Sequence, residues 1–177
     1  PPATADGRET LTMSVVAIPS GDLDSQDRLA LQRELRSAVE NVPGFMVYGD
    51  DVVLPGLEDR GTDTCVREPL CLSSVGRNGG VERILLARVA RGSAGYRLNV
   101  DFFDVNERLF LRYHVANGLG SFDDVINAVR PAVNDIFNIR TPRTGDEFVD
   151  DNAVNIQRIM AYSTAGLAVA SLAVGVY

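Results

Sequence analysis

The sequence predicts an α+β fold with a mixed or antiparallel sheet, followed by a C-terminal transmembrane helix. Three segments in the middle of the chain alternate apolar and polar residues, or are richly apolar, over the length of a strand. Two longer segments, one before and one after them, repeat apolar residues at helical spacing. The last residues, 159–177, carry no charge, and as a helix they would span about 28 Å, close to the ~30 Å hydrocarbon core of a bilayer.

The composition is that of a folded domain, and it disfavours two classes of partner. Of the 177 residues, 45% are hydrophobic and 23% are charged, as in globular proteins. The net charge is −7 and the basic residues are not clustered, which disfavours nucleic acid and anionic lipid headgroups as main partners. All 17 Lys or Arg residues are Arg, whose planar side chain suits contacts with protein partners.

The domain is expected to begin with a strand and a helix. Residues Leu11–Ile18 alternate at first and then become apolar on both sides, as an interior strand does. A helix follows, because Leu31, Leu35 and Val39 recur at helical spacing. Three residues before it are candidate N-caps, namely Asp22, Asp24 and Ser25. Pro43 and Gly44 end this helix.

A short strand and a short helix come next. Residues Phe45–Gly49 predict the strand, and residues 50–64 an irregular stretch interrupted by Pro and Gly. Pro69 suits the first turn of a helix, where its missing N–H costs nothing, and Gly79 and Gly80 end that helix after Asn78.

Three consecutive strands are predicted as an antiparallel meander with one buried face. They are Val81–Ala90, Tyr96–Phe102 and Arg108–Val115, joined by hairpin-sized links. Alternation places one set of side chains inward: Tyr96, Leu98, Val100, Phe102, Leu109, Leu111, Tyr113 and Val115. The other set then points outward: Arg97, Asn99, Asp101, Arg108, Phe110, Arg112 and His114.

A long helix ends the domain. Ser121 is a candidate N-cap with two acidic residues after it, and a clear apolar stripe continues to Phe137. Pro131 is expected to kink or split this helix. The element order is thus β-α-β-α-β-β-β-α over residues 11–138. A flexible arm (1–10) precedes this domain; an acidic linker (139–152) and the transmembrane helix (153–177) follow it.

The two cysteines, Cys65 and Cys71, favour a disulfide. They lie six residues apart around Pro69, which bends the path so that their Cα atoms can approach to within about 6 Å. Such a bridge would place the domain in an oxidising compartment such as the periplasm. Two unpaired thiols are the plain alternative. A metal site would need two further ligands, and the only histidine lies on a distant strand.

Several of these residues resemble a known family. The stretch from Cys65 to Phe110 is similar to exported bacterial envelope proteins with a TolB N-terminal-like domain, in the Cys-pair variant found in myxobacteria. Cys65 and Cys71 match the Cys pair of that group, Ile84–Val89 its first central strand, and Asp104 its Asp. The resemblance covers about residues 11–138. It implies a TolB-like fold and a non-enzymatic role in assembly of the cell envelope.

The apolar C-terminal segment carries small residues on one side of its predicted helix. They are Ala161, Ala165, Ala168, Ser171 and Gly175. Small residues at this spacing let a second helix approach closely, so we expect a partner helix in the membrane. Two alternatives are a helix buried in a soluble core and a strand of an outer-membrane barrel.

The motifs of common enzymes are missing from the sequence. It contains no P-loop, GxGxxG, HExxH or GxSxG string. His114 is the one candidate acid or base, and an exposed strand histidine is its plainer interpretation. Paired aspartates lie at turns, at a helix start and in the linker, where acids are favoured for local reasons. We therefore assign no catalytic residue, no metal ligand and no cofactor.

Three functions compete on this basis. The favoured one is a non-enzymatic, membrane-anchored periplasmic subunit that scaffolds or stabilises an envelope complex, with other membrane proteins and the bilayer as partners and the inner membrane as its site. Its expected partner face comprises Arg97, Asp101, Arg108 and Arg112. The alternatives are a periplasmic sensor or activator that binds a small ligand or peptidoglycan, and an enzyme that uses His114.

Overall fold

The computed structural model describes residues 10–19, 23–40 and 42–138. The expected N-terminal arm, the acidic linker and the small-residue C-terminal helix lie outside these ranges. Within the ranges, no helix is both long enough and apolar enough to cross a bilayer.

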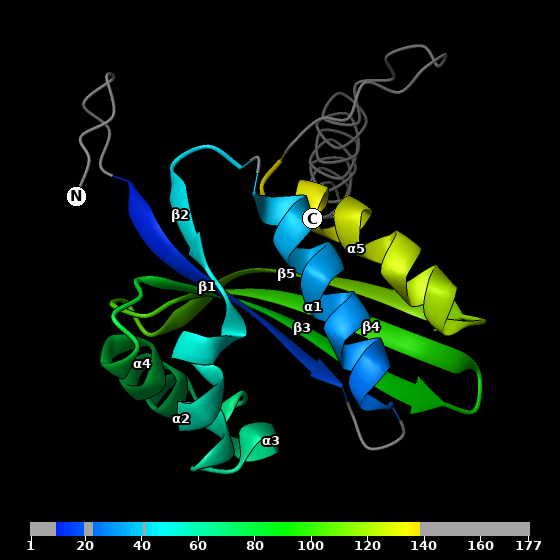
Figure 1. The fold of residues 1–177 in the computed structure, drawn as a ribbon, viewed down its shortest axis with the longest axis horizontal. Helices are drawn as coiled ribbons and strands as arrows, with labels where there is room; N and C mark the ends of the chain where they lie inside the picture. The colour runs from blue at the N-terminus through cyan, green and yellow to red at the C-terminus, as the bar shows by residue number, and fades with distance from the viewer. Residues whose placement is uncertain (1–9, 20–22, 41, 139–177) are drawn as a thin grey trace, which may run out of the picture. The chain divides into compact units, whose positions relative to one another are not determined.

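A mixed sheet of five strands organises the domain (Figure 1). The strand order is β2-β1-β3-β4-β5; β1 runs parallel to β2 and β3, and the β3–β4–β5 meander is antiparallel. The elements follow in the order β1 (Leu11–Pro19), α1 (Ser25–Val39), β2 (Phe45–Tyr48), η1 (Asp50–Val52), α2 (Leu54–Glu58), α3 (Thr62–Cys65), α4 (Pro69–Asn78), β3 (Arg83–Gly92), β4 (Gly95–Asp104), β5 (Leu109–Leu119) and α5 (Phe122–Ile136). The predicted α+β class and mixed sheet are confirmed.

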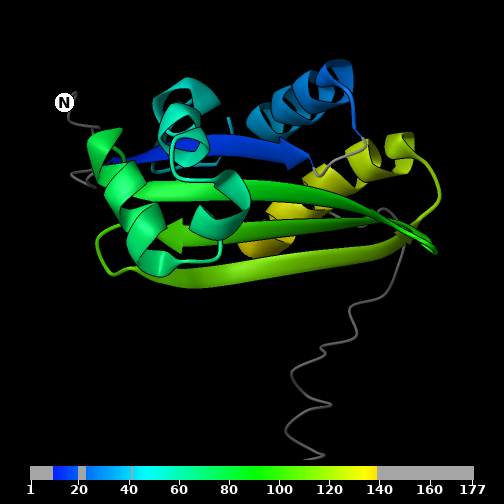
Figure 2. The same cartoon turned by 90° about the horizontal axis from the view of Figure 1, so that it is seen from below.

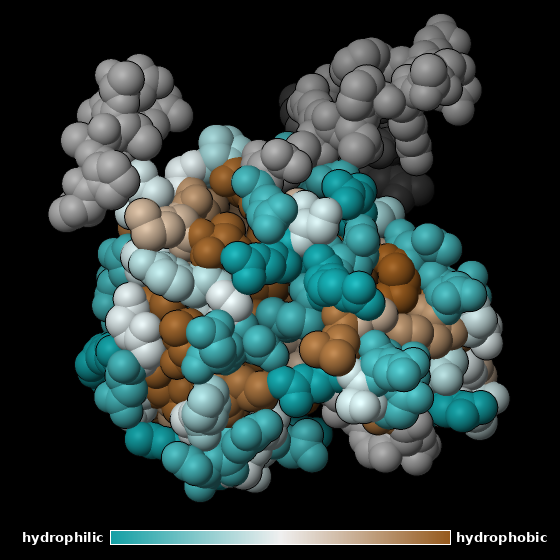
Figure 3. All heavy atoms as spheres, viewed as in Figure 1, coloured by the Kyte–Doolittle hydropathy of each residue, from teal (hydrophilic) through white to brown (hydrophobic). Residues whose placement is uncertain are grey.

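Two helices cover the first face of the sheet. Both α1 and α5 bury an apolar stripe against alternate residues of β1, β3 and β4. Their starts are fixed locally: the side chain of Asp24 accepts hydrogen bonds from two backbone N–H groups, and Ser121 forms a capping box with Asp124. The outer surface of α1 is largely hydrophilic (Figure 3), as expected for an amphipathic helix.

The second face of the sheet is covered only in part. The short helices α2, α3 and α4 enclose a second core against Val16, Ile84 and Phe103. Figure 2 shows α3 and α4 in front of one half of the strands, with no helix drawn over the other half. The half left open carries the end of β3 and the start of β4.

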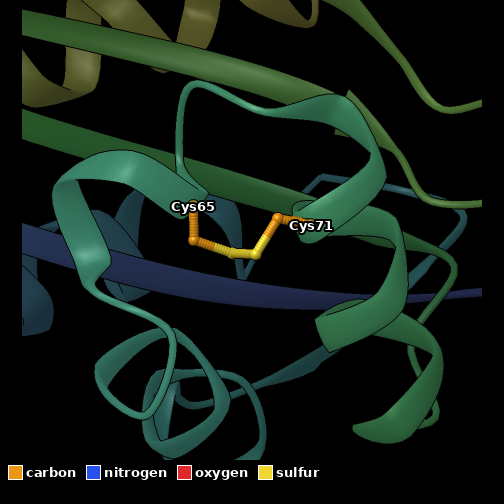
Figure 4. Close-up of a disulfide and its surroundings, with 2 residues drawn as sticks. All are labelled: Cys65 and Cys71. Atoms are coloured by element: carbon orange, nitrogen blue, oxygen red, sulfur yellow. A yellow bond between two sulfur atoms is a disulfide. The ribbon is translucent and has the colours of Figure 1, made fainter.

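The predicted disulfide joins the short helices. Cys65 at the end of α3 is bonded to Cys71 in the first turns of α4, with the two Cα atoms 5.2 Å apart (Figure 4). Cys65 is buried in the second core. The bridge thus links a four-residue helix to the longer α4, and a helix this short would be marginal alone.

One expectation for the helices was wrong, and a second was wrong in part. Residues 50–64 were expected to be irregular, but they contain η1, α2 and most of α3. These elements are too short to show a helical period, and burial of Val53, Leu57 and Cys65 in the second core stabilises them. Pro131 does not split α5, which continues to Ile136 because Ala132, Val133 and Ile136 are buried beyond it.

A β-bulge reverses the faces that were expected for β5. Phe103 pairs with Phe110 but Phe102 pairs with Arg112, so Leu111 is an extra residue between two regular stretches. Without this bulge Phe102 would pair with Leu111, and the predicted alternation would hold. The shift of one residue moves the side chains of residues 112–116 to the opposite face, up to a second register shift between Ala116 and Leu119.

The side chains that lie on the face opposite to the expected one are Arg112, His114, Tyr113 and Val115. Arg112 and His114 were expected to point outward, but they face α5: Arg112 donates a hydrogen bond to the carbonyl of Ile136, and Nδ1 of His114 lies 2.9 Å from Oδ2 of Asp135. Tyr113 and Val115 were expected to point inward. They pair with Asp101 and Asn99 and therefore share the second face of the sheet.

Candidate protein-binding surface

Strand β5 forms one edge of the sheet and exposes large apolar side chains along it. The exposed fractions are 43% for Leu109, 37% for Phe110, 42% for Leu111 and 72% for Tyr113. Four such residues within five positions are unusual on a monomeric soluble domain. We call these four residues, together with Arg108 and Arg112, the β5 edge surface.

The backbone of β5 is also available on its outer side. In the described part of the chain, β4 is the only strand that pairs with β5, and no side chain hydrogen-bonds to the backbone of β5. About half of the N–H and C=O groups of an edge strand point away from its neighbour. Such an edge is a template for another extended segment.

The charge along the β5 edge surface is positive. Arg108 and Arg112 are exposed there. The exposed acids beside them are Glu107 in the adjoining turn and Asp135 of α5, which bonds to His114. The nearest acids of β4 are already paired: Asp104 lies 3.0 Å from Arg83, and Asp101 lies 2.7 Å from Arg88. An acidic chain with a net charge of −7 thus has a basic, apolar strip at this edge.

The turn before β5 fixes the position of Arg108. Oδ1 of Asp104 accepts hydrogen bonds from the backbone N–H groups of Asn106 and Glu107, each at 2.9 Å. The chain then reverses through Arg108, whose φ of 60° lies in the left-handed region. Arg108 therefore belongs to the turn, although the sequence pattern predicts it as the first strand residue.

The expected partner residues do not share one face. Arg97 and Asp101 share the second face, but Arg97 is exposed on its open half. Asp101 lies opposite the buried Leu86, is 9% exposed and accepts both hydrogen bonds from Arg88. Arg112 is on the first face and Arg108 in the turn. Their role in binding a partner stays a prediction, now centred on the edge rather than on a flat face.

His114 has a structural partner in its hydrogen bond to Asp135 of α5. Within the described residues, no serine, threonine or cysteine side chain is hydrogen-bonded to it, so no nucleophile lies in the position that acid–base activation requires. No group of three potential metal ligands is found in those residues either.

An open pocket of about 390 Å³ lies where α5 ends beside β5. Its lining is Phe102, Leu111, Arg112, Ile136, Phe137 and Asn138. Ligand sites usually combine an apolar lining with several converging polar groups. Here the polar side chains are Arg112, which already bonds to a backbone carbonyl, and Asn138. The pocket therefore gives little support to a small-ligand site.

Comparison with known proteins gives similarities of fold only. No family model and no curated protein matches the chain. Among solved structures, the LpoB C-terminal domain from Salmonella enterica is 15% identical with a TM-score of 0.44, covering 63% of this chain and 85% of that one. Lipoprotein GNA1162 from Neisseria meningitidis is 18% identical with a TM-score of 0.46, covering 74% and 99%. TolB from Acinetobacter baumannii is 10% identical with a TM-score of 0.44, covering 72% of this chain and 28% of that one.

A TolB structure is thus among the structures to which this chain is similar. Membership of the Cys-pair group stays a prediction. The three TM-scores are below 0.5 and the identities below 25%, so the function of this chain has to be inferred from its own residues.

One sequence pattern indicates the β5 edge surface, although the assumption of strict alternation obscures it. Leu109, Phe110 and Leu111 are three consecutive apolar residues, and a strand with one buried face cannot bury all three. A run of this kind next to a polar turn indicates a bulge or an exposed apolar patch.

Proposed function

We propose that this chain is a non-enzymatic, membrane-anchored subunit that scaffolds or stabilises a cell-envelope complex. The domain would lie in the periplasm, and residues 153–177 would form a helix in the inner membrane. The observation that carries this proposal is the β5 edge surface. Four exposed apolar side chains adjoin a strand edge that is unpaired among the described residues.

Two features support the location. The Cys65–Cys71 disulfide is of the kind that persists in oxidising compartments. The uncharged segment 159–177 has the length of a membrane span, and its small residues would allow close contact with a partner helix. The partners would then be other membrane proteins of the complex.

Gentle detergent extraction of the full-length protein tests this function. We expect specific membrane proteins to co-purify, and we expect fewer of them with Ala168→Leu or Gly175→Leu, because a larger side chain blocks close helix packing. Met160→Leu, a substitution of similar size in the same segment outside the small-residue set, is the control. Unchanged association of both variants, or a chain recovered without detergent, would refute membrane anchoring through this helix.

A further inference from the structure

We propose that β5 binds an extended, acidic and apolar segment of a partner protein, which adds to the sheet as a sixth strand. The observation behind it is a combination of three features: a strand edge that no other described strand pairs with, apolar side chains on both faces, and two exposed arginines. This inference rests on the proposed function only in taking the partner to be a protein.

The apolar side chains of the β5 edge surface point to both sides of the sheet. Phe110 and Tyr113 share the second face through their pairing with Phe103 and Asp101. Leu111 contributes to the pocket on the first face, beside Ile136. An added strand alternates its side chains in the same way, so it would cover both sets at once.

The chain's own C-terminal segment is a poor candidate for this sixth strand. Strand β5 runs in the same direction as β1, and α1 and α5 lie on the same face. The crossover β1–α1–β2 places β2 on one side of β1. A parallel strand after α5 would lie on the opposite side of β5, at the other edge of the sheet. The two crossovers would then have opposite hands, and right-handed crossovers predominate at about 98%. An antiparallel strand would first require the chain to travel back along β5.

A second copy of the chain is also disfavoured. Antiparallel pairing of two β5 strands over their apolar stretches would bring two copies of Arg108 and of Arg112 into one short region. The acids near these arginines, Glu107 in the turn and Asp135 on α5, lie outside the strand itself, and like charges on adjacent strands destabilise a pair. A partner segment with Asp or Glu opposite these arginines would instead form favourable ion pairs.

A capped eight-residue peptide of alternating Glu and Val is a suitable probe, with its Lys–Val counterpart as the matched control. The full-length protein in detergent is titrated with each peptide up to about 1 mM while backbone amide signals are followed by NMR. We expect the Glu–Val peptide to shift the signals of β5 and to slow exchange of its outer amides. The Lys–Val peptide should bind at least about tenfold more weakly.

Charge reversal provides the second arm of the experiment. Arg108→Glu/Arg112→Glu should weaken Glu–Val binding about tenfold and favour the Lys–Val peptide. Arg33→Glu, an exposed change on α1, should alter neither. A melting temperature within a few degrees of wild type shows that the double variant is folded; Arg108→Glu alone serves if the double variant is not.

Several outcomes would overturn the proposal. These are equal binding of the two peptides, signal changes at β2 instead of β5, or no change at β5 at the highest peptide concentration. Slow exchange of the outer β5 amides without peptide would also overturn it. If that protection depends on protein concentration, the occupant is a second copy of the chain. If it does not, the occupant is the chain's own tail. If co-purification persists in Arg108→Glu/Arg112→Glu, the proposed function stands while this binding mode fails. If the peptide binds but no membrane protein co-purifies, the function fails while the binding mode stands.

Discussion

The two edge strands of the sheet, β2 and β5, differ in how their unpaired backbone groups are protected. At the β2 edge, the strand is four residues long, and β1 extends past it. The side chain of Gln32 on α1 completes this part of β1: it donates to the carbonyl of Val15 and accepts from the N–H of Ala17, each at 2.7 Å. At the other edge, β5 is eleven residues long, and no side chain in the described residues bonds to its backbone.

Natural domains usually protect sheet edges, because unpaired backbone invites aggregation. The β2 edge follows this rule in two ways: the strand is short, and the Gln32 amide forms the two hydrogen bonds that a further strand would form with β1. At β5 the features in the described residues that limit uncontrolled pairing are the bulge at Leu111, the second register shift before Leu119 and the two arginines. The proposed binding of a partner segment at β5 would make use of this difference, and substitutions at either edge can test the contrast.

The largest expected effect is on the free energy of unfolding. It should be large for a variant of a residue that supports the fold and small for a variant of a residue that is available for binding. Phe103 and Phe110 form one ring pair with centroids 5.0 Å apart, but Phe103 is fully buried and Phe110 is 37% exposed. We expect Phe103→Ala to reduce the free energy of unfolding by about 3–5 kcal/mol. Phe110→Ala should reduce it by less than about 1 kcal/mol. Urea unfolding measures both, and equal losses would show that β5 is part of the core.

The disulfide should matter for the short helices and leave the β5 edge surface unaffected. Reduction of Cys65–Cys71 should reduce the free energy of unfolding by about 2 kcal/mol, since it opens a short loop between α3 and α4. Urea unfolding with and without reductant tests this, with Cys65→Ala/Cys71→Ala as the variant on which reductant cannot act. An unchanged midpoint for the wild type would contradict the expectation, as would loss of peptide binding on reduction.

Removal of the Gln32 amide should expose the protected edge. Gln32→Leu leaves the carbonyl of Val15 and the N–H of Ala17 without partners, at a cost of about 1–3 kcal/mol in the free energy of unfolding. Arg33→Leu, on the outer side of the same helix, should change stability by less than about 0.5 kcal/mol. If both variants unfold at the same denaturant concentration, the Gln32 contacts do not protect this edge.

The smallest effect concerns the turn before β5. Arg108 has φ of 60°, which glycine adopts without strain, so Arg108→Gly should raise the free energy of unfolding by up to about 1 kcal/mol. The same variant should weaken binding of the acidic peptide, because it removes one positive charge. Glu107→Gly in the same turn, where φ is not positive, should not gain stability. A destabilised Arg108→Gly variant would argue that this arginine is needed for the fold.

Much of the fold could be predicted from the sequence because its signals are local. The alternation of β4, the caps at Asp24 and Ser121, and Pro69 at the start of α4 each follow from chemistry within a few residues. The disulfide followed from the spacing of Cys65 and Cys71 around a proline.

The rest depends on contacts that are distant in the sequence. The bulge at Leu111 appears only when β5 is placed against β4, and it reverses the faces of Arg112 and Tyr113. The contacts of Gln32 require α1 to lie across β1. Sequence reasoning singled out Arg108 and Arg112, two residues of the β5 edge surface, but it expected them to share one face with Arg97 and Asp101.

Residue-specific hydrogen exchange of the full-length protein tests the contrast between the edges most directly. We expect slow exchange at the amide of Ala17, which bonds to Gln32, and fast exchange at alternate amides of β5. Addition of the Glu–Val peptide should slow the β5 amides and leave those of β1 and β2 unchanged. Slow exchange along all of β5 before any peptide is added, or a response at β2 instead, would contradict the claim that β5 is the open edge.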